Sequence, residues 1–315
     1  MVRFLTKCVH FGGLTIYICA SDIANILKIG KNERINIKAK LSTFLTAVAI
    51  LLFASVSNAE VIKDDGFQWN VEIAVAIISD PSNLVGAEQK ETSDYFGGSL
   101  ILDLYYKGFF IESNRHRLNY QLQSSDFGYE LVSEDTYDID LLARSYINPF
   151  DENNAGVIFE ELNEELEGIE PRDAYLLQGV RYTGYRNNDV YWFSVGVDIL
   201  DGVHHGWVLD GFYTSTYHLR NWDLQLGAGA TLFSANMNQY YFGIEQGESS
   251  DSRPIYTPSA GYRGEFEISG RYPVNEHWLL TTGLTLSHYS KSIDDSPITA
   301  RQNVLRYVLS VSYVF

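Results

Sequence analysis

Apolar and polar residues alternate through the last twelve residues of the chain. The apolar positions are Leu305, Tyr307, Leu309, Val311, Tyr313 and Phe315. Arg306, Ser310 and Ser312 lie between them. Because successive side chains of a β-strand point to opposite faces, the pattern predicts a strand with one apolar face and one partly polar face. A sandwich would bury the apolar face, whereas a bacterial outer-membrane barrel would turn it to lipid.

The same alternation recurs over residues 67–78, 222–232 and 278–286. In residues 262–272, apolar residues and glycine alternate with a second row. This row consists of Arg263, Glu265, Glu267, Ser269 and Arg271. Charged side chains at alternate positions are difficult to place in a sandwich core, but they suit the wet interior of a membrane barrel. The pattern therefore predicts a serial up-and-down array of antiparallel strands.

Turn signals divide these strands into hairpins. With the C-terminus on the periplasmic side, tight periplasmic turns fall at residues 186–189, 218–221 and 273–276. The longer insertions then lie on the opposite side, at residues 80–97, 148–172, 201–205, 234–256 and 290–303. This asymmetry is typical of outer-membrane barrels. Trp222 and Trp278 follow periplasmic turns with outward parity, as an interfacial aromatic belt requires, whereas Trp192 has inward parity.

We therefore expect an all-β protein, a transmembrane up-and-down antiparallel β-barrel. The segmentation is 67–78, 99–107, 108–114, 116–124 and 128–147, followed by seven strands from residue 173 onward. This gives twelve strands, with ten as the alternative, because single-chain bacterial barrels have even strand numbers. The turn at residues 114–116 rests on composition alone.

The N-terminal region has the features of an export signal. Residues 41–56 form an apolar run after Lys38 and Lys40, and residues 57–59 (SNA) make a small-x-small cleavage site. The run is short for a spanning helix, so residues 37–59 are predicted to be a cleaved signal peptide. Residues 1–36 precede a signal peptide that is already complete, and we expect them to be a mis-assigned upstream extension. Residues 60–315 would form the barrel domain.

Charge limits the choice of partners. The whole chain has a formal charge of −17, and removal of residues 1–59, which hold seven basic and two acidic residues, would leave −22. Nucleic acid is excluded as a partner, because phosphate binding needs basic residues. Both cysteines, Cys8 and Cys19, precede the predicted cleavage site, so the exported part needs no disulfide. An aromatic content of 14% with long ordered alternation argues against disorder.

Four segments resemble one family of outer-membrane proteins. Residues 238–244 (NQYYFGI) are similar to its tyrosine-rich segment that ends in glycine and an aliphatic residue, and residues 294–298 (DDSPI) to the loop before its last strand. Residues 166–173 (LEGIEPRD) resemble its approach to a central strand. Asp198 with residues 204–206 (HHG) resembles its aspartate–histidine stretch, although residues 200–202 replace the usual small residues. In this order, the segments identify a resemblance to the MipA/OmpV family.

The resemblance implies a Gram-negative outer-membrane scaffold. Such a protein would bind a membrane-bound lytic transglycosylase and a bifunctional penicillin-binding protein, and would thereby link murein cleavage to murein synthesis. Other expected partners are outer-membrane lipid, lipopolysaccharide and the barrel-assembly machinery, which would recognise the strand that ends at Phe315. A small cation-preferring channel and a surface adhesin remain as alternatives, because one fold serves several roles.

The evidence for catalytic or metal-binding residues in the sequence is weak. His288 and Ser290 have the H-x-S spacing of lipid A deacylases, with Asp294 or Asp295 as the orienting carboxylate. A rim histidine beside polar loop residues is the simpler interpretation. His204 and His205 with Asp201 suggest a metal site, but adjacent side chains in a tight loop diverge. We therefore expect no enzyme activity, no cofactor and no catalytic or metal residues.

Residues 148–172 are the most acidic stretch, with eight carboxylates from Asp151 to Glu170. Ile158, Leu162, Leu166 and Ile169 recur within it at helical spacing. The spacing predicts a short amphipathic helix over the barrel mouth. A solvated loop kept soluble by its charge is favoured over a site for divalent cations, because the carboxylates lack the spacing of a calcium loop.

Overall fold

The computed structural model describes residues 9–11, 14–16, 66–79, 81–87, 96–113, 118, 125–152, 163–199 and 204–315. The chain divides into two compact units, residues 1–61 and residues 62–315. In the first unit, β1 (Val9–Phe11) pairs antiparallel with β2 (Leu14–Ile16).

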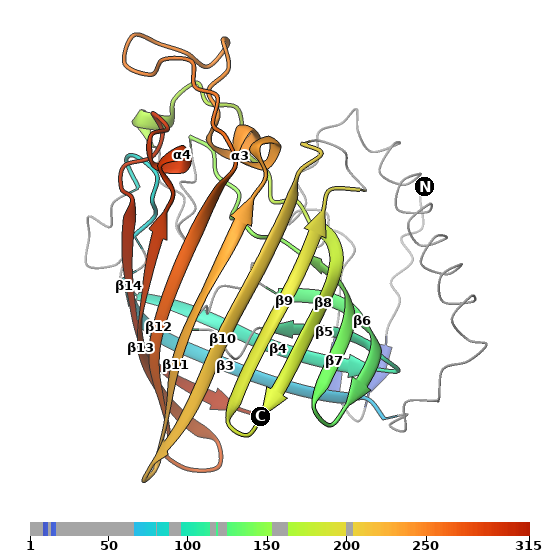
Figure 1. Cartoon of the computed structure of the whole chain (residues 1–315). Helices are drawn as coiled ribbons and strands as arrows, with labels where there is room; N and C mark the ends of the chain where they lie inside the picture. The colour runs from blue at the N-terminus through green and yellow to red at the C-terminus, as the bar shows by residue number, and fades with distance from the viewer. Residues whose placement is uncertain are drawn as a thin grey trace, which may run out of the picture. The chain divides into compact units, whose positions relative to one another are not determined.

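The second unit is a closed antiparallel β-barrel (Figure 1). Twelve strands of the described residues form it: β3 (Gln68–Ser79), β4 (Phe96–Tyr106), β5 (Phe109–Ser113), β6 (Ser125–Glu134), β7 (Tyr137–Arg144), β8 (Leu177–Arg186), β9 (Asp189–Val197), β10 (Trp207–Leu219), β11 (Trp222–Phe233), β12 (Gly261–Pro273), β13 (Trp278–Tyr289) and β14 (Asn303–Val314). Each strand pairs with the next along the chain, and β14 closes the barrel on β3, with Val311 opposite Val75. The up-and-down topology and the strand number are confirmed.

The predicted segmentation was wrong in the first half of the barrel. Residues 128–147 are not one strand: β6 and β7 form a hairpin that turns at Asp135 and Thr136. A shift in register between Glu130 and Val132 hid this turn, since a bulge breaks strict alternation. The predicted strand 116–124 and the turn at 114–116 lie outside the described residues, except for Leu118, which is not in a strand. The total of twelve strands nevertheless agrees with the prediction.

Burial follows the predicted alternation, with apolar side chains outward. In β14, Leu305 and Leu309 are 56% and 44% exposed, whereas Ser310 and Ser312 are 2% and 0% exposed. In β12, Phe266 is exposed and the neighbouring Glu267 is buried. This is the reverse of a soluble protein and suits a barrel that faces lipid outside and holds polar groups inside.

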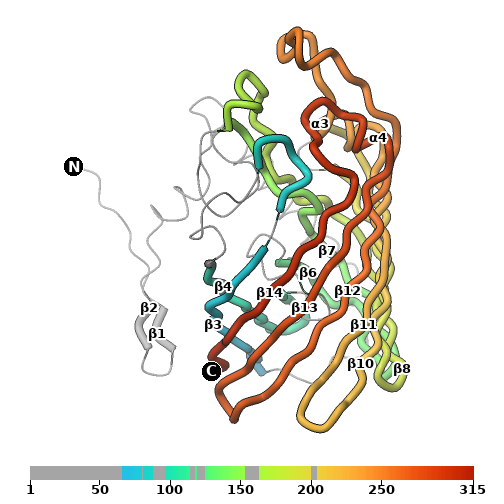
Figure 2. The backbone as a smooth tube through the Cα atoms, turned by 90° about the vertical axis from the view of Figure 1, so that its left-hand side faces the viewer, coloured from blue at the N-terminus to red at the C-terminus, as the bar shows by residue number. Residues whose placement is uncertain are grey.

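The two ends of the barrel differ (Figures 1 and 2). The end with short connections, here called the turn end, carries the turns at residues 107–108, 135–136, 187–188, 220–221 and 274–277, together with the C-terminus. Gly108, Asn187 and Arg220 have φ values of 82°, 55° and 55°, the left-handed conformation that two-residue hairpin turns require.

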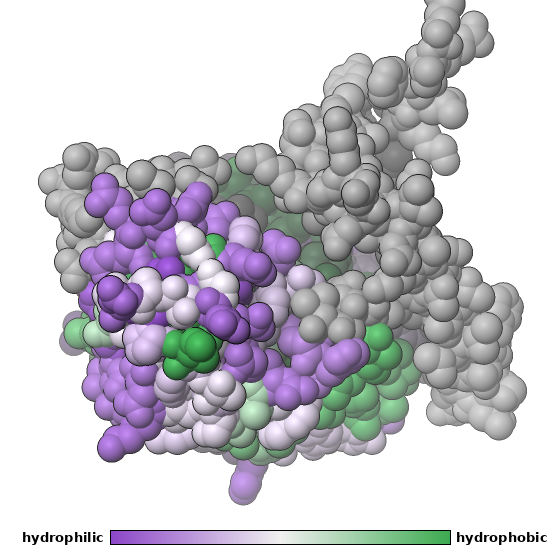
Figure 3. Space-filling model, turned by 90° about the horizontal axis from the view of Figure 1, so that it is seen from above, coloured by the Kyte–Doolittle hydropathy of each residue, from purple (hydrophilic) through white to green (hydrophobic). Residues whose placement is uncertain are grey.

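The opposite end, here called the loop end, carries the longer connections. They include the short helices η3 (Glu164–Leu166), α3 (Ala235–Phe242) and α4 (Lys291–Asp294). No helix in the described ranges is long and apolar enough to cross a membrane. Seen from above, hydrophilic residues dominate the described surface of the loop end (Figure 3).

Aromatic residues gather at the turn end as predicted. Trp222 packs against Tyr272, with ring centroids 5.2 Å apart, and Trp278 packs against Tyr313 at the same distance. Trp192 points inward, is 3% exposed and stacks on Phe212. The outward tryptophans therefore form part of an aromatic belt at one edge of the apolar band.

Candidate functional site: a polar lumen beneath a loop cap

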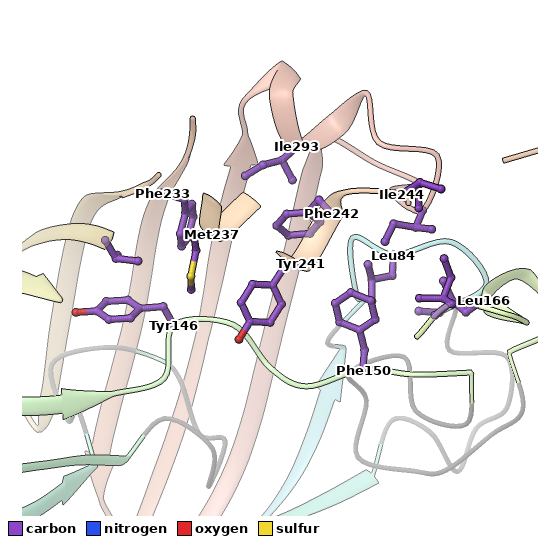
Figure 4. Packing of buried hydrophobic residues seen from close by; sticks show 14 of the residues in the cluster. Leu84, Tyr146, Phe150, Leu166, Phe233, Met237, Tyr241, Phe242, Ile244 and Ile293 are labelled. Atoms are coloured by element: carbon purple, nitrogen blue, oxygen red, sulfur yellow. The ribbon is translucent and has the colours of Figure 1, made fainter. Parts of the chain in front are cut away.

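An apolar cluster covers the loop end of the barrel (Figure 4). Helix α3 begins after Ser234, whose Oγ accepts a hydrogen bond from the backbone N–H of Met237 at 3.3 Å. Its side chains pack against residues from three other loops. The buried members of the cluster from these loops are Leu84, Ala87, Tyr146, Phe150, Leu166, Ile169, Ile293 and Ile298. We call this assembly the loop cap.

A buried ion pair joins two loops of the cap. The Glu248 carboxylate accepts hydrogen bonds from Arg172 Nη2 at 2.7 and 2.9 Å, and from the backbone N–H groups of Glu170 and Glu245 at 2.9 and 3.0 Å. Burial alone would raise the pKa of Glu248, but the two N–H groups and the arginine outweigh burial and lower this pKa from its ordinary value. The carboxylate is therefore held in its ionised form.

The four segments that suggested the family resemblance meet in this cap. The Tyr241 hydroxyl donates to the carbonyl of Asp173 at 2.9 Å, and the N–H of Asp173 donates to the Tyr240 hydroxyl at 2.9 Å. Ser296 Oγ donates to the carbonyl of Phe242 at 2.6 Å. The His204 ring packs against Tyr240, with centroids 5.6 Å apart. Their role in this structure is thus to close the loop end.

Beneath the cap, two arginines organise the charged groups of the lumen. Arg144 of β7 contacts Asp126 of β6 through Nε at 2.6 Å and through Nη2, and reaches Asp210 of β10 through Nη1 at 3.2 Å. Asp210 also accepts hydrogen bonds from Trp192 Nε1 at 3.2 Å and Thr231 Oγ1 at 2.8 Å. The contact between Arg144 and Asp210 bridges β7 and β10, which are not neighbours in the barrel.

Arg181 of β8 is the second arginine. It contacts Asp140 of β7 at 2.8 Å, Asp126 at 3.1 Å, and Glu112 of β5. We call the six residues Glu112, Asp126, Asp140, Arg144, Arg181 and Asp210 the lumen network. Four carboxylates share two guanidinium groups, so the network is net negative. Buried ion pairs of this kind are retained only when additional hydrogen bonds satisfy their atoms.

The charged side chains predicted on β12 also point into the barrel, where they pair within β12 and with β3. Arg263 lies 3.4 Å from Glu265 of the same strand, and Arg271 lies 3.6 Å from Glu72 of β3. Glu267 accepts a hydrogen bond at 3.0 Å from the backbone N–H of Leu118, which packs on Ala76 and Val308 of the inner wall. The β5–β6 connection therefore enters the barrel at Leu118.

Comparison with known proteins decides the family. A family model described as MltA-interacting protein MipA matches residues 73–315. The chain belongs to the MipA family.

Relatives of this MipA-family chain carry outer-membrane names. A 24 kDa outer membrane protein of Pasteurella multocida is 23% identical over 222 residues, which cover 69% of this chain and 80% of the relative. The putative outer membrane protein YiaT of Escherichia coli K12 is 24% identical over 48% of this chain and 61% of the relative. OmpV of Vibrio cholerae is 28% identical over 30% of this chain and 36% of the relative. This MipA-family chain is thus an outer-membrane protein.

Solved structures similar to it include the outer-membrane channel DcaP of Acinetobacter baumannii, with a TM-score of 0.39, 8% identity and coverage of 79% of this chain and 96% of DcaP. OmpT of Vibrio cholerae has a TM-score of 0.35 and 7% identity, and the similarity covers 82% of this chain and 100% of OmpT. The fold of the MipA-family chain follows from its own strand pairing.

His288 and Ser290, suggested as a hydrolase pair, form hydrogen bonds to other residues. His288 Nδ1 hydrogen-bonds Asn303 Oδ1 at 2.8 Å, whereas Ser290 Oγ accepts the N–H of Tyr262 at 3.0 Å. Ser290 precedes α4, and its carbonyl accepts the N–H of Asp294 at 3.0 Å. These contacts assign His288 and Ser290 to the rim of the barrel and the start of a loop.

The suggested metal residues occupy a turn. Asp198 Oδ2 accepts the N–H groups of His204 and His205 at 3.0 Å each, which stabilises the turn before β10. His204 is buried and His205 is exposed, so the two rings diverge as expected. Asp201 lies outside the described residues. Within the described ranges, no group of three or more histidine, cysteine or carboxylate side chains is placed to hold a metal.

The acidic segment is described only at its ends. Leu166 and Ile169 are buried in the loop cap, which agrees with an apolar face over the mouth. Around them the structure has the three-residue helix η3, and Ile158 and Leu162 lie outside the described residues.

Sequence reasoning missed the lumen network. Asp140 and Arg144 lie in residues 128–147, which were taken as a single strand, and Asp126 lies between two predicted strands. The common inward parity of the three residues was therefore not visible. The polar pair Asp135 and Thr136 was the available signal for a hairpin.

Proposed function

We propose that this MipA-family protein is a closed outer-membrane scaffold that holds murein-cleaving and murein-synthesising enzymes together, without catalytic activity of its own. The observation that carries the proposal is the lumen network, in which Arg144 and Arg181 join strands from β5 to β10 through the barrel interior. A barrel filled by paired side chains beneath a packed cap serves better as an anchor than as a pore.

The family description supports the choice of partners. The matching model is named for interaction with MltA, and the resemblance implies a lytic transglycosylase together with a bifunctional penicillin-binding protein. These enzymes act on murein in the periplasm, so they would meet the turn end of the barrel. Short turns offer a modest surface, which favours several weak contacts over one deep interface.

Export and assembly belong to the same proposal. Residues 37–59 would be removed as a signal peptide, and the turn end would face the periplasm. Phe315 lies at the turn end, where its N–H donates to the carbonyl of Val71 at 3.1 Å. The barrel-assembly machinery would therefore recognise β14 before β14 pairs with β3.

Two measurements on the purified full chain test the scaffold. Planar-bilayer recordings should show no single-channel steps. The chain should also bind a purified lytic transglycosylase when it is captured through a tag inserted at Asp251 in the loop end, but not when it is captured through a tag at Asp135 in the turn end. An absence of binding in both orientations would overturn the scaffold.

A cation-preferring channel is the second candidate, and the composition of the lumen network favours it. Four carboxylates against two arginines would raise the local concentration of cations in any continuous water path. Reproducible cation-selective conductance steps from pure protein would overturn the scaffold proposal in favour of the channel.

A further inference from the structure

A carboxylate points to lipid at the turn end of the β8–β9 hairpin. Asp189 is the first residue of β9 and shares the outward parity of Phe193, which is 64% exposed. Ser215 Oγ of β10 donates a hydrogen bond to Asp189 Oδ1 at 2.6 Å. A carboxylate accepts about four hydrogen bonds, so this one donor leaves acceptor capacity on the lipid side.

Tyrosines from three neighbouring strands surround this position. Tyr137 of β7 stacks on Tyr182 of β8, with centroids 5.8 Å apart and an interplanar angle of 17°. Tyr182 contacts Tyr191 of β9 at 6.2 Å. The Tyr191 ring lies over Gly184, where a Cβ would come within 2.3 Å of Tyr191 Cζ. The missing side chain at Gly184 therefore makes room for a flat aromatic surface beside Asp189.

An arginine completes the group. Arg186 is the last residue of β8 and the register partner of Asp189 across the two-residue turn. It is exposed, and within the described part of the chain its guanidinium has no ion-pair partner. A cationic and an anionic side chain thus lie side by side on the outward surface, at the edge of the aromatic belt.

We propose that Asp189, Arg186 and the adjoining tyrosines bind the headgroup of an aminophospholipid. The lipid ammonium would donate to Asp189 and lie against the tyrosine rings, and the lipid phosphate would contact Arg186. Charge complementarity selects this occupant: a lipid-facing carboxylate is costly unless it is paired, and a zwitterionic headgroup supplies both opposite charges at interfacial depth. An anionic lipid would satisfy Arg186 and leave Asp189 without its cation.

Native mass spectrometry of the detergent-purified full chain tests the proposal, with equimolar phosphatidylethanolamine and phosphatidylglycerol of identical acyl chains. The wild type should retain roughly fivefold more phosphatidylethanolamine, a ratio of the size that one charge-assisted contact provides. Asp189→Asn should lower this ratio to about one. Arg186→Gln should reduce the binding of both lipids.

Asp135→Asn is the matched control, because Asp135 lies in the equivalent turn between β6 and β7. It should keep the wild-type ratio, and heat-shifted migration in electrophoresis should show that every variant is folded. Equal retention of both lipids by the wild type would overturn the proposal. So would an unchanged ratio in Asp189→Asn, and loss of a co-purifying protein in that variant would then identify the surface as a protein contact.

Discussion

Arg144 of β7 and Asp210 of β10 meet inside the barrel, with 3.2 Å between Nη1 and Oδ2, although β8 and β9 separate their strands. The same guanidinium pairs with Asp126 on the other side. One side chain therefore ties together walls that share no backbone hydrogen bonds.

Removing this arginine should destabilise the barrel. Arg144→Met leaves Asp126 and Asp210 buried without their cation, and we expect a loss of about 3–5 kcal/mol in the free energy of unfolding. Urea titration of the protein in detergent or lipid, followed by heat-shifted electrophoresis, measures this loss. Arg220→Gln in the exposed β10–β11 turn is the control, with an expected change within about 0.5 kcal/mol. A loss for Arg144→Met no larger than that of the control would contradict the role of the network.

Outward and inward positions should respond differently to the same charge. Leu284 is 44% exposed on the outer face, and Leu284→Arg should cost ~2–4 kcal/mol near the bilayer midplane. Gln225 of β11 points inward and is partly exposed, so Gln225→Arg should cost far less. Thr285, the inward neighbour of Leu284, is 2% exposed and is too confined for this comparison. Folding into lipid vesicles measures both variants, and equal damage would contradict the assigned faces.

The loop cap should loosen at acidic pH. The pKa of Glu248 in the folded protein lies below its ordinary value of 4.5, so its full stabilising contribution is present above that value and is lost as pH falls through the lowered pKa. Hydrogen exchange of residues 163–172 and 244–256 at pH 7 and near pH 3 measures the loosening.

Glu248→Gln should already exchange faster at pH 7 and should lose this pH dependence. Glu245→Gln is the matched control, because Glu245 uses its backbone N–H in the cap while its residue is exposed. A Glu248→Gln variant with wild-type protection would show that the ion pair does not hold the cap.

The two ends of the barrel should differ in accessibility. An epitope inserted at Asp251 in the loop end should be detected on intact cells, whereas one at Asn187 should require permeabilisation of the outer membrane, as expected for long outer loops and short periplasmic turns. Labelling of intact cells at Asn187 would show that the turn end faces the cell exterior and not the periplasm.

N-terminal sequencing tests the export signal. The purified protein should begin at Glu60, because the apolar run 41–56 ends before a small-x-small cleavage site. Recovery of residues before Leu41 would show that the upstream segment is retained.

The sequence by itself determined the strand type, the outward face and the inward charged row of β12, because these depend on the alternation of side chains along one strand. It also placed Trp192 inward and Trp222 and Trp278 in the belt. Only the tertiary structure decided which charges meet. Arg144 and Asp210 are 66 residues apart, and barrel closure brings them together. The same holds for the loop cap, in which Tyr241 reaches Asp173, since contacts between separate loops have no periodic signal in the chain.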